Sequence, residues 1–336
     1  MKWKFYSLAF VAGMSILTAC SSDDNNDNDG NGGNGNGNEI ENGTILKGTI
    51  TSDVTLAAGN TYKLSGEYIV EEGATLHIEE GVKIIAVYDD IADYILVKQG
   101  GKINAVGTPD KPIVMTSEKE EPGAWGGIHI CGRAHTNAEG GKGSSEIGGA
   151  VYGGNDDADN SGTLQYIRLE YTGFAFDEEH EANGISFYSV GNGTIVDHCQ
   201  AYKGSDDGFE FFGGSVNVSN LVAVSCSDDS FDWTEGWNGK GTNLVAYQEA
   251  ESTLGYDCDC LMECDNNGSN NAATPVAHPV LKNLILVGNG GSKQGIRLRA
   301  GTEVEIDNAK VCGKGQPLTV ETALTENALK NGTSKL

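Results

Sequence analysis

The stretch that decides the fold is Asp206-Asp207-Gly208-Phe209-Glu210-Phe211, which returns 22 residues later as Asp228-Asp229-Ser230-Phe231-Asp232-Trp233. A plainer copy, Gly184-Ile185-Ser186-Phe187, comes 24 residues before it. Between these units, Asn220-Leu221-Val222-Ala223 recurs 23 residues later as Asn243-Leu244-Val245-Ala246. Repeats of this length are typical of stacked units that bury a continuous core only by contacting their neighbours.

Each unit has the pattern of a short strand. Two apolar residues flank one central residue, so two side chains point inward and one points outward. Glycine, asparagine and aspartate separate the units, as tight corners require. A leucine-rich repeat would need leucines and an asparagine ladder at fixed positions, which we do not find in the sequence. The prediction is an all-β fold, a right-handed parallel β-helix (β-solenoid) with coils of about 22–25 residues.

The amino-terminal residues have the features of an export signal. Lys2 and Lys4 precede an apolar run over residues 5–17, and Leu17-Thr18-Ala19-Cys20 resembles a bacterial lipobox. We therefore expect a lipoprotein signal peptide at residues 1–19, with Cys20 as the lipidated new amino terminus; an ordinary signal with an incidental cysteine is the alternative. Residues 20–42 would be the lipid anchor and a disordered tether, because residues 23–38 contain only Asn, Asp and Gly.

The remaining residues, 43–336, are predicted to form a single parallel β-helix domain. Residues 133–160 are long, glycine-rich and acidic and are expected to form a projecting loop, and residues 269–279 a second excursion. The rung at Gly295-Ile296-Arg297-Leu298 is the last clear one, and the tail beyond Gly315 is expected to cap the end of the stack.

A family resemblance rests on several segments of this domain: residues 72–76, 107–113, 125–128, 206–214, 228–232 and 263–267. Together they resemble the β-helix lipoproteins and secreted proteins of Bacteroidetes, in the pectate-lyase-like superfamily. The resemblance implies a protein anchored in the outer membrane and facing the cell exterior, and the acidic residues after Cys20 resemble a surface-export signal. Pectate lyases and polygalacturonases share the fold with only generic motif overlap, so fold and location are implied more strongly than any activity.

The outward positions of the predicted coils bring acids together. Stacking places His129, Ser186, Glu210, Asp232, then Asp257 or Glu263, then Arg297 in one outward column. Coil length favours Asp257, whereas the family pattern favours Glu263. Coils about 4.8 Å apart bring two carboxylates to a repulsion of about 3–4 kcal/mol at an effective dielectric of 20.

Three explanations of the acids stay open. The first is a cation, Ca²⁺, held by some of Asp206, Asp207, Glu210, Asp228, Asp229, Asp232, Asp257, Glu263 and Asp265. The second is a pair of catalytic carboxyls that share a proton, as in a glycoside hydrolase. The third is that corner aspartates cap turns and the column is solvated.

The catalytic candidates are Glu210, Asp232, Glu263 and Arg297. Acids that hold calcium near a basic residue resemble the arrangement of pectate-lyase-like enzymes, in which an arginine removes a proton from an acidic sugar. The alternative is that Arg297 only neutralises the column. The sequence shows no complete set of nucleophile, acid and base, and no dense Lys/Arg cluster to attract a uronate polymer.

Aromatic and sulfur side chains allow two further expectations. Phe212, Trp237 and Tyr188 could offer exposed faces beside the acids for sugar rings, or could fill gaps between strands, whereas Trp233 is expected in the core. Seven cysteines remain after Cys20. Buried thiols or one local disulfide are favoured over a zinc site at Cys258, Cys260 and Cys264, whose spacing is not typical of zinc ligands.

The formal charge of −26 excludes nucleic acid as a partner. The favoured function is a cell-surface lipoprotein that binds a glycan or another extracellular ligand through an acidic, calcium-binding face. The alternatives are a polysaccharide lyase or glycoside hydrolase, and a structural or adhesive component of an outer-membrane complex. The expected partners are the outer membrane through Cys20, and a polysaccharide or an outer-membrane protein.

Overall fold

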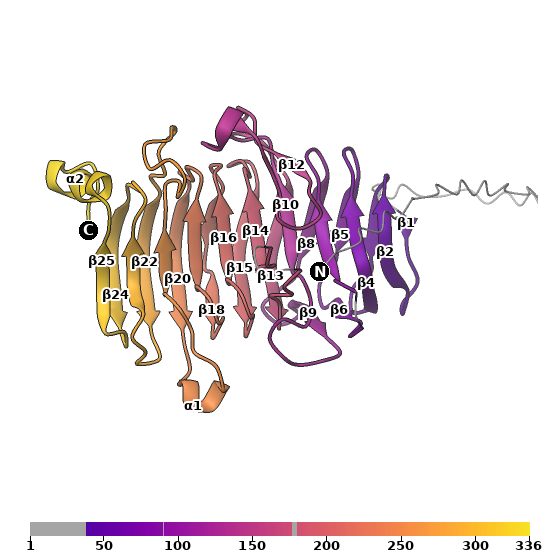
Figure 1. The fold of residues 1–336 in the computed structure, drawn as a ribbon. Coiled ribbons are helices and arrows are strands. Elements are labelled where there is room, and N and C mark those ends of the chain that lie inside the picture. Colours follow the sequence, from indigo (N-terminus) through magenta and orange to yellow (C-terminus); the bar gives the residue numbers. More distant parts are fainter. Residues whose placement is uncertain (1–37, 90, 177–179) are drawn as a thin grey trace, which may run out of the picture. The chain divides into compact units, whose positions relative to one another are not determined.

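The computed structural model describes residues 38–89, 91–176 and 180–336 (Figure 1). The predicted signal peptide, Cys20 and the tether up to residue 37 lie outside the described residues. Strand β1 (Asn38–Glu39) already pairs with β3, so the β-structure begins within the stretch assigned to the tether.

The predicted right-handed parallel β-helix is confirmed, and each coil contributes to three faces. The first face contains β1, β3 (Val54–Leu56), β5 (Thr75–Ile78), β8 (Lys102–Val106) and β17 (Asn217–Ser219). The second face contains β6 (Lys83–Ala86), β9 (Ile113–Ser117) and β18 (Val222–Val224). Five longer strands bend across both faces: β13 (Gly162–Glu170), β15 (Ile195–Tyr202), β20 (Lys240–Tyr247), β22 (Val280–Val287) and β24 (Glu305–Cys312).

The third face carries the repeated strand of the sequence. It contains β7 (Tyr94–Val97), β10 (Ile128–Cys131), β14 (Ile185–Tyr188), β16 (Phe209–Phe212), β19 (Phe231–Thr234), β21 (Met262–Cys264), β23 (Gln294–Leu298) and β25 (Gln316–Val320). Strands β2 (Ile45–Ile50) and β4 (Thr61–Val70) bend from the second face to the third.

The inward side chains stack from coil to coil. The rings of Phe187 and Phe211 lie 5.0 Å apart, and those of Phe209 and Phe231 lie 5.6 Å apart. Trp233 is buried in the same core, as expected. Because each coil adds one layer of inward apolar side chains, the apolar core continues along the stack.

An asparagine ladder runs along one corner, and the expectation that the chain has no such ladder is wrong. Each of Asn243, Asn283 and Asn308 donates from its side-chain amide to the carbonyl oxygen of the preceding asparagine, at 2.8–3.0 Å, starting from Asn220. All four have positive φ: 55° at Asn220, 58° at Asn243, 59° at Asn283 and 62° at Asn308. Asparagine suits this corner because it tolerates left-handed backbone and its amide both donates and accepts.

Residues 133–160 fold back instead of projecting freely. They contain the short helix η1 (Glu139–Gly141) and a two-stranded sheet of β11 (Gly143–Ser144) and β12 (Val151–Tyr152). Ile147, Ala150 and Tyr152 pack on outward side chains of the third face to form a second, smaller apolar cluster. This segment therefore covers part of the face, and we call it the covering loop.

The carboxyl-terminal tail adds one more rung, β25, which pairs with β23 and was not expected from the repeat. Helix α2 (Ala323–Asn331) follows and lies at the end of the stack (Figure 1). A further short helix, α1 (Glu251–Leu254), is inserted between β20 and β21. Within the described part of the chain, no helix is both long and apolar enough to cross a membrane.

Candidate functional site

The outward column of the third face exists in the predicted order. His129 pairs in register with Ser186, Ser186 with Glu210, and Glu210 with Asp232. Asp232 then pairs with Glu263, and Glu263 with Arg297. The acids that the sequence places two dozen residues apart are thus vertical neighbours.

Asp257 is not in this column, so the prediction from coil length is wrong at that position. The insertion of α1 lengthens the coil, and 31 residues separate Asp232 from its partner Glu263. Asp257 is exposed, and its Oδ1 accepts hydrogen bonds from the Asn289 side chain at 2.8 Å and from the Cys258 amide at 2.9 Å.

Seven carboxyl side chains line one pocket of about 190 Å³ on this face. Glu210 and Asp232 enter it from β16 and β19, and three aspartates come from the corners before these strands. The lining residues are Glu146, Glu181, Asp206, Asp207, Glu210, Asp228 and Asp232. None of them is basic, and we call this the acidic pocket.

Glu146 and Glu181 were not predicted from the sequence. Glu146 lies on the covering loop, and Glu181 lies in the connection before β14. Neither segment follows the repeat, so no periodic signal places these residues beside the column.

The carboxyl groups approach one another closely. One oxygen from each of Asp206, Asp207 and Asp228 lies within 4.8 Å of the others, and the same holds for Asp207, Glu210 and Asp232. A third such group, Asp229, Asp232 and Glu263, continues toward the carboxyl-terminal end. Asp207 and Asp232 are each shared by two groups, so the groups form a continuous series.

Hydrogen bonds hold some of these oxygens and leave others free. Asp207 Oδ1 accepts from the Asp229 amide at 2.8 Å, and Asp229 Oδ1 accepts from the Cys260 amide at 2.6 Å. These two corner aspartates therefore bond backbone amides of the next coil, 22 and 31 residues further on, and these bonds are not caps of their own turns. Asn183 Nδ2 donates to Glu210 Oε2 at 2.6 Å. In contrast, the buried Asp232 Oδ1 has no hydrogen-bond partner among the described residues.

Burial makes the charged forms of these acids costly. It raises the pKa of Asp206 to about 8, with the charge of Asp228 as the next cause, and raises the pKa of Glu146 to about 7. Burial and then the neighbouring carboxylates raise the pKa of Asp207, Glu210 and Asp232 well above the ordinary range. Such a pocket either holds protons or requires a compensating cation.

The acids at the other end of the series are neutralised within the chain. Arg297 donates to Glu263 at 2.8 Å and to Glu321 at 2.9 Å. Arg299, which was not predicted, pairs with Glu263 and, at 2.7 Å, with Asp265. The hydrogen bond to Glu321, together with Glu263, raises the pKa of Arg297. This guanidinium is therefore poorly suited to remove a proton, and Glu263 and Asp265 are less available to a cation than the acids of the pocket.

The prediction that Tyr188, Trp237 and Phe212 expose aromatic faces to a sugar is wrong. Tyr188 is fully buried, Trp237 is 1% exposed and Phe212 is 7% exposed. The covering loop is the reason for Tyr188, whose ring lies 5.1 Å from that of Tyr152 and 4.4 Å from that of Phe212. Trp237 is instead part of the solenoid core, stacked 4.1 Å from Phe211.

Among the described residues, no group of possible metal ligands contains a histidine, and one contains a cysteine. All seven cysteines of the described residues are free thiols, and six are buried. No group of possible metal ligands among these residues combines Cys258, Cys260 and Cys264; Cys260 alone lies near Asp229 and Asp259. His129 is buried in the column, and this burial lowers its pKa to about 4.

Comparison with known proteins agrees with this architecture. The family described as "Pectate-lyase like beta helix domain" matches residues 48–336. A search of curated proteins gave no significant match.

Proposed function

Since the chain belongs to the pectate-lyase-like beta helix family, we propose that it is a cell-surface protein that binds a glycan with the help of Ca²⁺ in the acidic pocket. Family membership fits a carbohydrate-related function in general terms. The observation that supports a bound cation is the pocket itself, in which seven carboxyl side chains converge without a basic residue.

The residues fit a hard cation. Ca²⁺ takes about 6–8 oxygen ligands, and Asp206, Asp207, Glu210, Asp228 and Asp232 would hold it with carboxylate oxygens. The unpartnered Asp232 Oδ1 would gain a partner. Sulfur and histidine nitrogen do not line the pocket, so a soft metal is disfavoured.

The size of the pocket supports a cation over a sugar. Small-molecule sites occupy about 300–1,000 Å³, whereas the acidic pocket has about 190 Å³. A metal ion with its waters fits this volume, and the glycan would then contact another part of the protein.

A calcium titration of the full chain by calorimetry tests the cation. We expect saturable binding that Asp232→Asn weakens by tenfold or more, since the isosteric amide removes one charged ligand. The matched control is Asp257→Asn, which changes an exposed aspartate outside the pocket. Equal calcium binding by both variants would show that Asp232 is not a ligand. If the unmodified chain binds no calcium, the proposed cation site is contradicted.

We further propose that Cys20 carries the lipid that anchors the protein in the outer membrane, facing outward. Mass spectrometry of the mature amino terminus and protease treatment of intact cells test this. A Cys20→Ser variant should be released from the membrane fraction. Retention of that variant would contradict the anchor.

A hydrolase is the second candidate, and one observation favours it. Oxygens of Asp207, Glu210 and Asp232 lie within 4.8 Å of one another, and carboxyls about 5–5.5 Å apart suit a retaining glycosidase. A release of reducing ends that Asp232→Asn abolishes would replace binding by catalysis as the function. A lyase is less favoured, because Arg297 is bound to two glutamates.

A further inference from the structure

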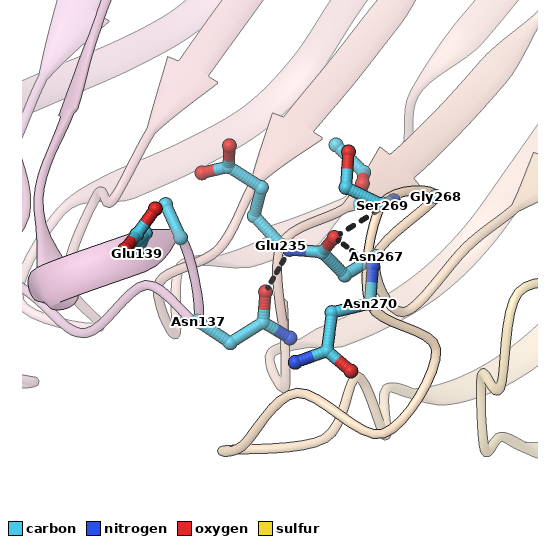
Figure 2. Close-up of a pocket in the computed structure, with 9 residues that line it drawn as sticks. Asn137, Glu139, Glu235, Asn267, Gly268, Ser269 and Asn270 are labelled. Carbon is cyan, nitrogen blue, oxygen red and sulfur yellow. Dashed lines mark hydrogen bonds between the residues drawn. The ribbon is translucent and has the colours of Figure 1, made fainter.

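A second, larger cavity lies at the other end of the third-face strands. It has a volume of about 710 Å³ and is bounded by the covering loop, by the turn after β19 and by the loop after β21. Its lining includes Asn137, Glu139, Thr234, Glu235, Ser269 and Asn270 (Figure 2). We call it the amide pocket.

Its floor is held by a saturated hydrogen-bond network. The buried Asn266 donates to the carbonyl oxygens of Asn271 at 3.2 Å and Ala273 at 3.0 Å. Its Oδ1 accepts from Asn137 Nδ2 and from the Ala277 amide, both at 2.8 Å. Asn266 thus uses both the nitrogen and the oxygen of its side-chain amide. Because these bonds join the covering loop to the loop after β21, both loops are held in place before any ligand binds.

Other polar groups of the lining have atoms that could form further hydrogen bonds with a ligand. Glu235 Oε2 accepts from Thr136 at 2.7 Å and from Tyr152 at 2.9 Å, whereas no described residue donates to its Oε1. The Ser269 hydroxyl and the Asn270 side-chain amide nitrogen also make no hydrogen bond to a described residue. In Figure 2, Glu139 lies on one side and Ser269 and Asn270 on the other, with Glu235 between them. A ligand in this space would meet acceptors and donors from several directions.

The chemistry of the lining selects the ligand. Its charged groups are the two glutamates, and no lysine or arginine contributes to it. Carboxylates accept strong hydrogen bonds from hydroxyl groups and repel anions. The volume lies within the range of about 300–1,000 Å³ that small-molecule sites occupy. A neutral, hydroxyl-rich molecule therefore fits, and a uronate does not.

We infer that the amide pocket is the glycan site and that it takes a neutral oligosaccharide. The inference rests on the proposed function, since it names the place and the class of the glycan. Glu139, Glu235, Ser269 and Asn270 are its contact residues.

The test is calorimetric titration of the full chain with neutral gluco-, manno- and xylo-oligosaccharides and with oligogalacturonate. Ser269→Trp fills the exposed rim of the cavity without removing a hydrogen bond of the network, and should abolish binding. Glu139→Gln should weaken it about threefold to tenfold, as expected for the loss of a charge-assisted hydrogen bond at an exposed position. Glu251→Gln, on α1, is the matched control and should bind normally.

Neutral binding that Ser269→Trp removes would support the inference. It would be overturned if that variant bound normally, if only oligogalacturonate bound, or if no neutral oligosaccharide bound at all. A calcium titration of the same variants separates the two proposals. Normal calcium binding without neutral saccharide binding would contradict only the proposed glycan site. Saccharide binding without calcium binding would contradict only the proposed calcium site.

Discussion

Glu210 on β16 and Asp232 on β19 are register partners on adjacent coils, and their carboxyl groups share one small pocket with Asp207. Without a counter-charge this arrangement is unfavourable for the ionised forms of both acids. Burial and mutual repulsion each raise the pKa of the two carboxyl groups. The pairing is a direct consequence of the 22-residue step between the two strands.

The stability of the cation-free protein should fall as the pH rises. The folded-state pKa of Asp206 is about 8, against an ordinary value of 3.8, and that of Glu146 is about 7, against 4.5. Between these limits the folded state binds protons that the unfolded state has lost. Each such group therefore costs about 1.4 kcal/mol per pH unit. We expect melting temperatures in EDTA to decrease from about pH 5 to about pH 8, and calcium to remove most of this decrease.

The effect of calcium on this pH profile is the informative quantity, because other carboxyls with lowered pKa contribute the opposite slope in both conditions. The Asp206→Asn variant should have a flatter profile in EDTA. A profile that is identical with calcium and with EDTA would contradict a cation in the acidic pocket.

Removing the charge of Arg299 should destabilise the protein. Arg299→Met leaves Asp265, whose side chain is 11% exposed, without its partner and leaves Glu263 only Arg297. Breaking such a pair costs about 3–5 kcal/mol when fully buried, so we expect about 2–4 kcal/mol in urea denaturation. Lys282→Met, which breaks the exposed pair with Asp307, should cost less than about 1 kcal/mol. Equal losses for the two variants would show that Arg299 has no special role.

The asparagine ladder should contribute measurably to stability. Asn283→Ala removes a bond to Asn243 and one from Asn308, and places alanine at a φ of 59°. The lost bonds and the strain together predict about 2–3 kcal/mol. Asn283→Gly removes the same bonds without the strain and should be less damaging by about 1 kcal/mol. If glycine and alanine have the same effect, the backbone conformation does not contribute.

Trp237 should behave as a core residue. Trp237→Ala should lower the free energy of unfolding by about 3–5 kcal/mol, because the indole is buried against Phe211. Trp237→Phe keeps the stacking and should retain saccharide binding at normal affinity. A loss of binding by the stable Phe variant would restore the original expectation of an aromatic sugar contact.

Much of the architecture could be predicted from the sequence, because the repeat is a local property. The steps between Ser186, Glu210 and Asp232 predict their stacking correctly. The same reasoning fails at Asp257, since inserted residues such as α1 change the length of a coil without leaving a periodic trace. The asparagine ladder gives no clear repeat in the sequence for a related reason, because Asn283 lies 40 residues beyond Asn243.

The sequence by itself determined the coil, the apolar column and the ridge of acids, because each follows from which residues recur along the chain. Only the tertiary structure decided which of those acids stay uncompensated. Glu146 joins the acidic pocket and Tyr188 is covered because the covering loop folds back over the third face, while Arg299 neutralises the far end. These contacts join residues with no common period, and their free energy depends on burial and distance, which exist only once the coils are stacked.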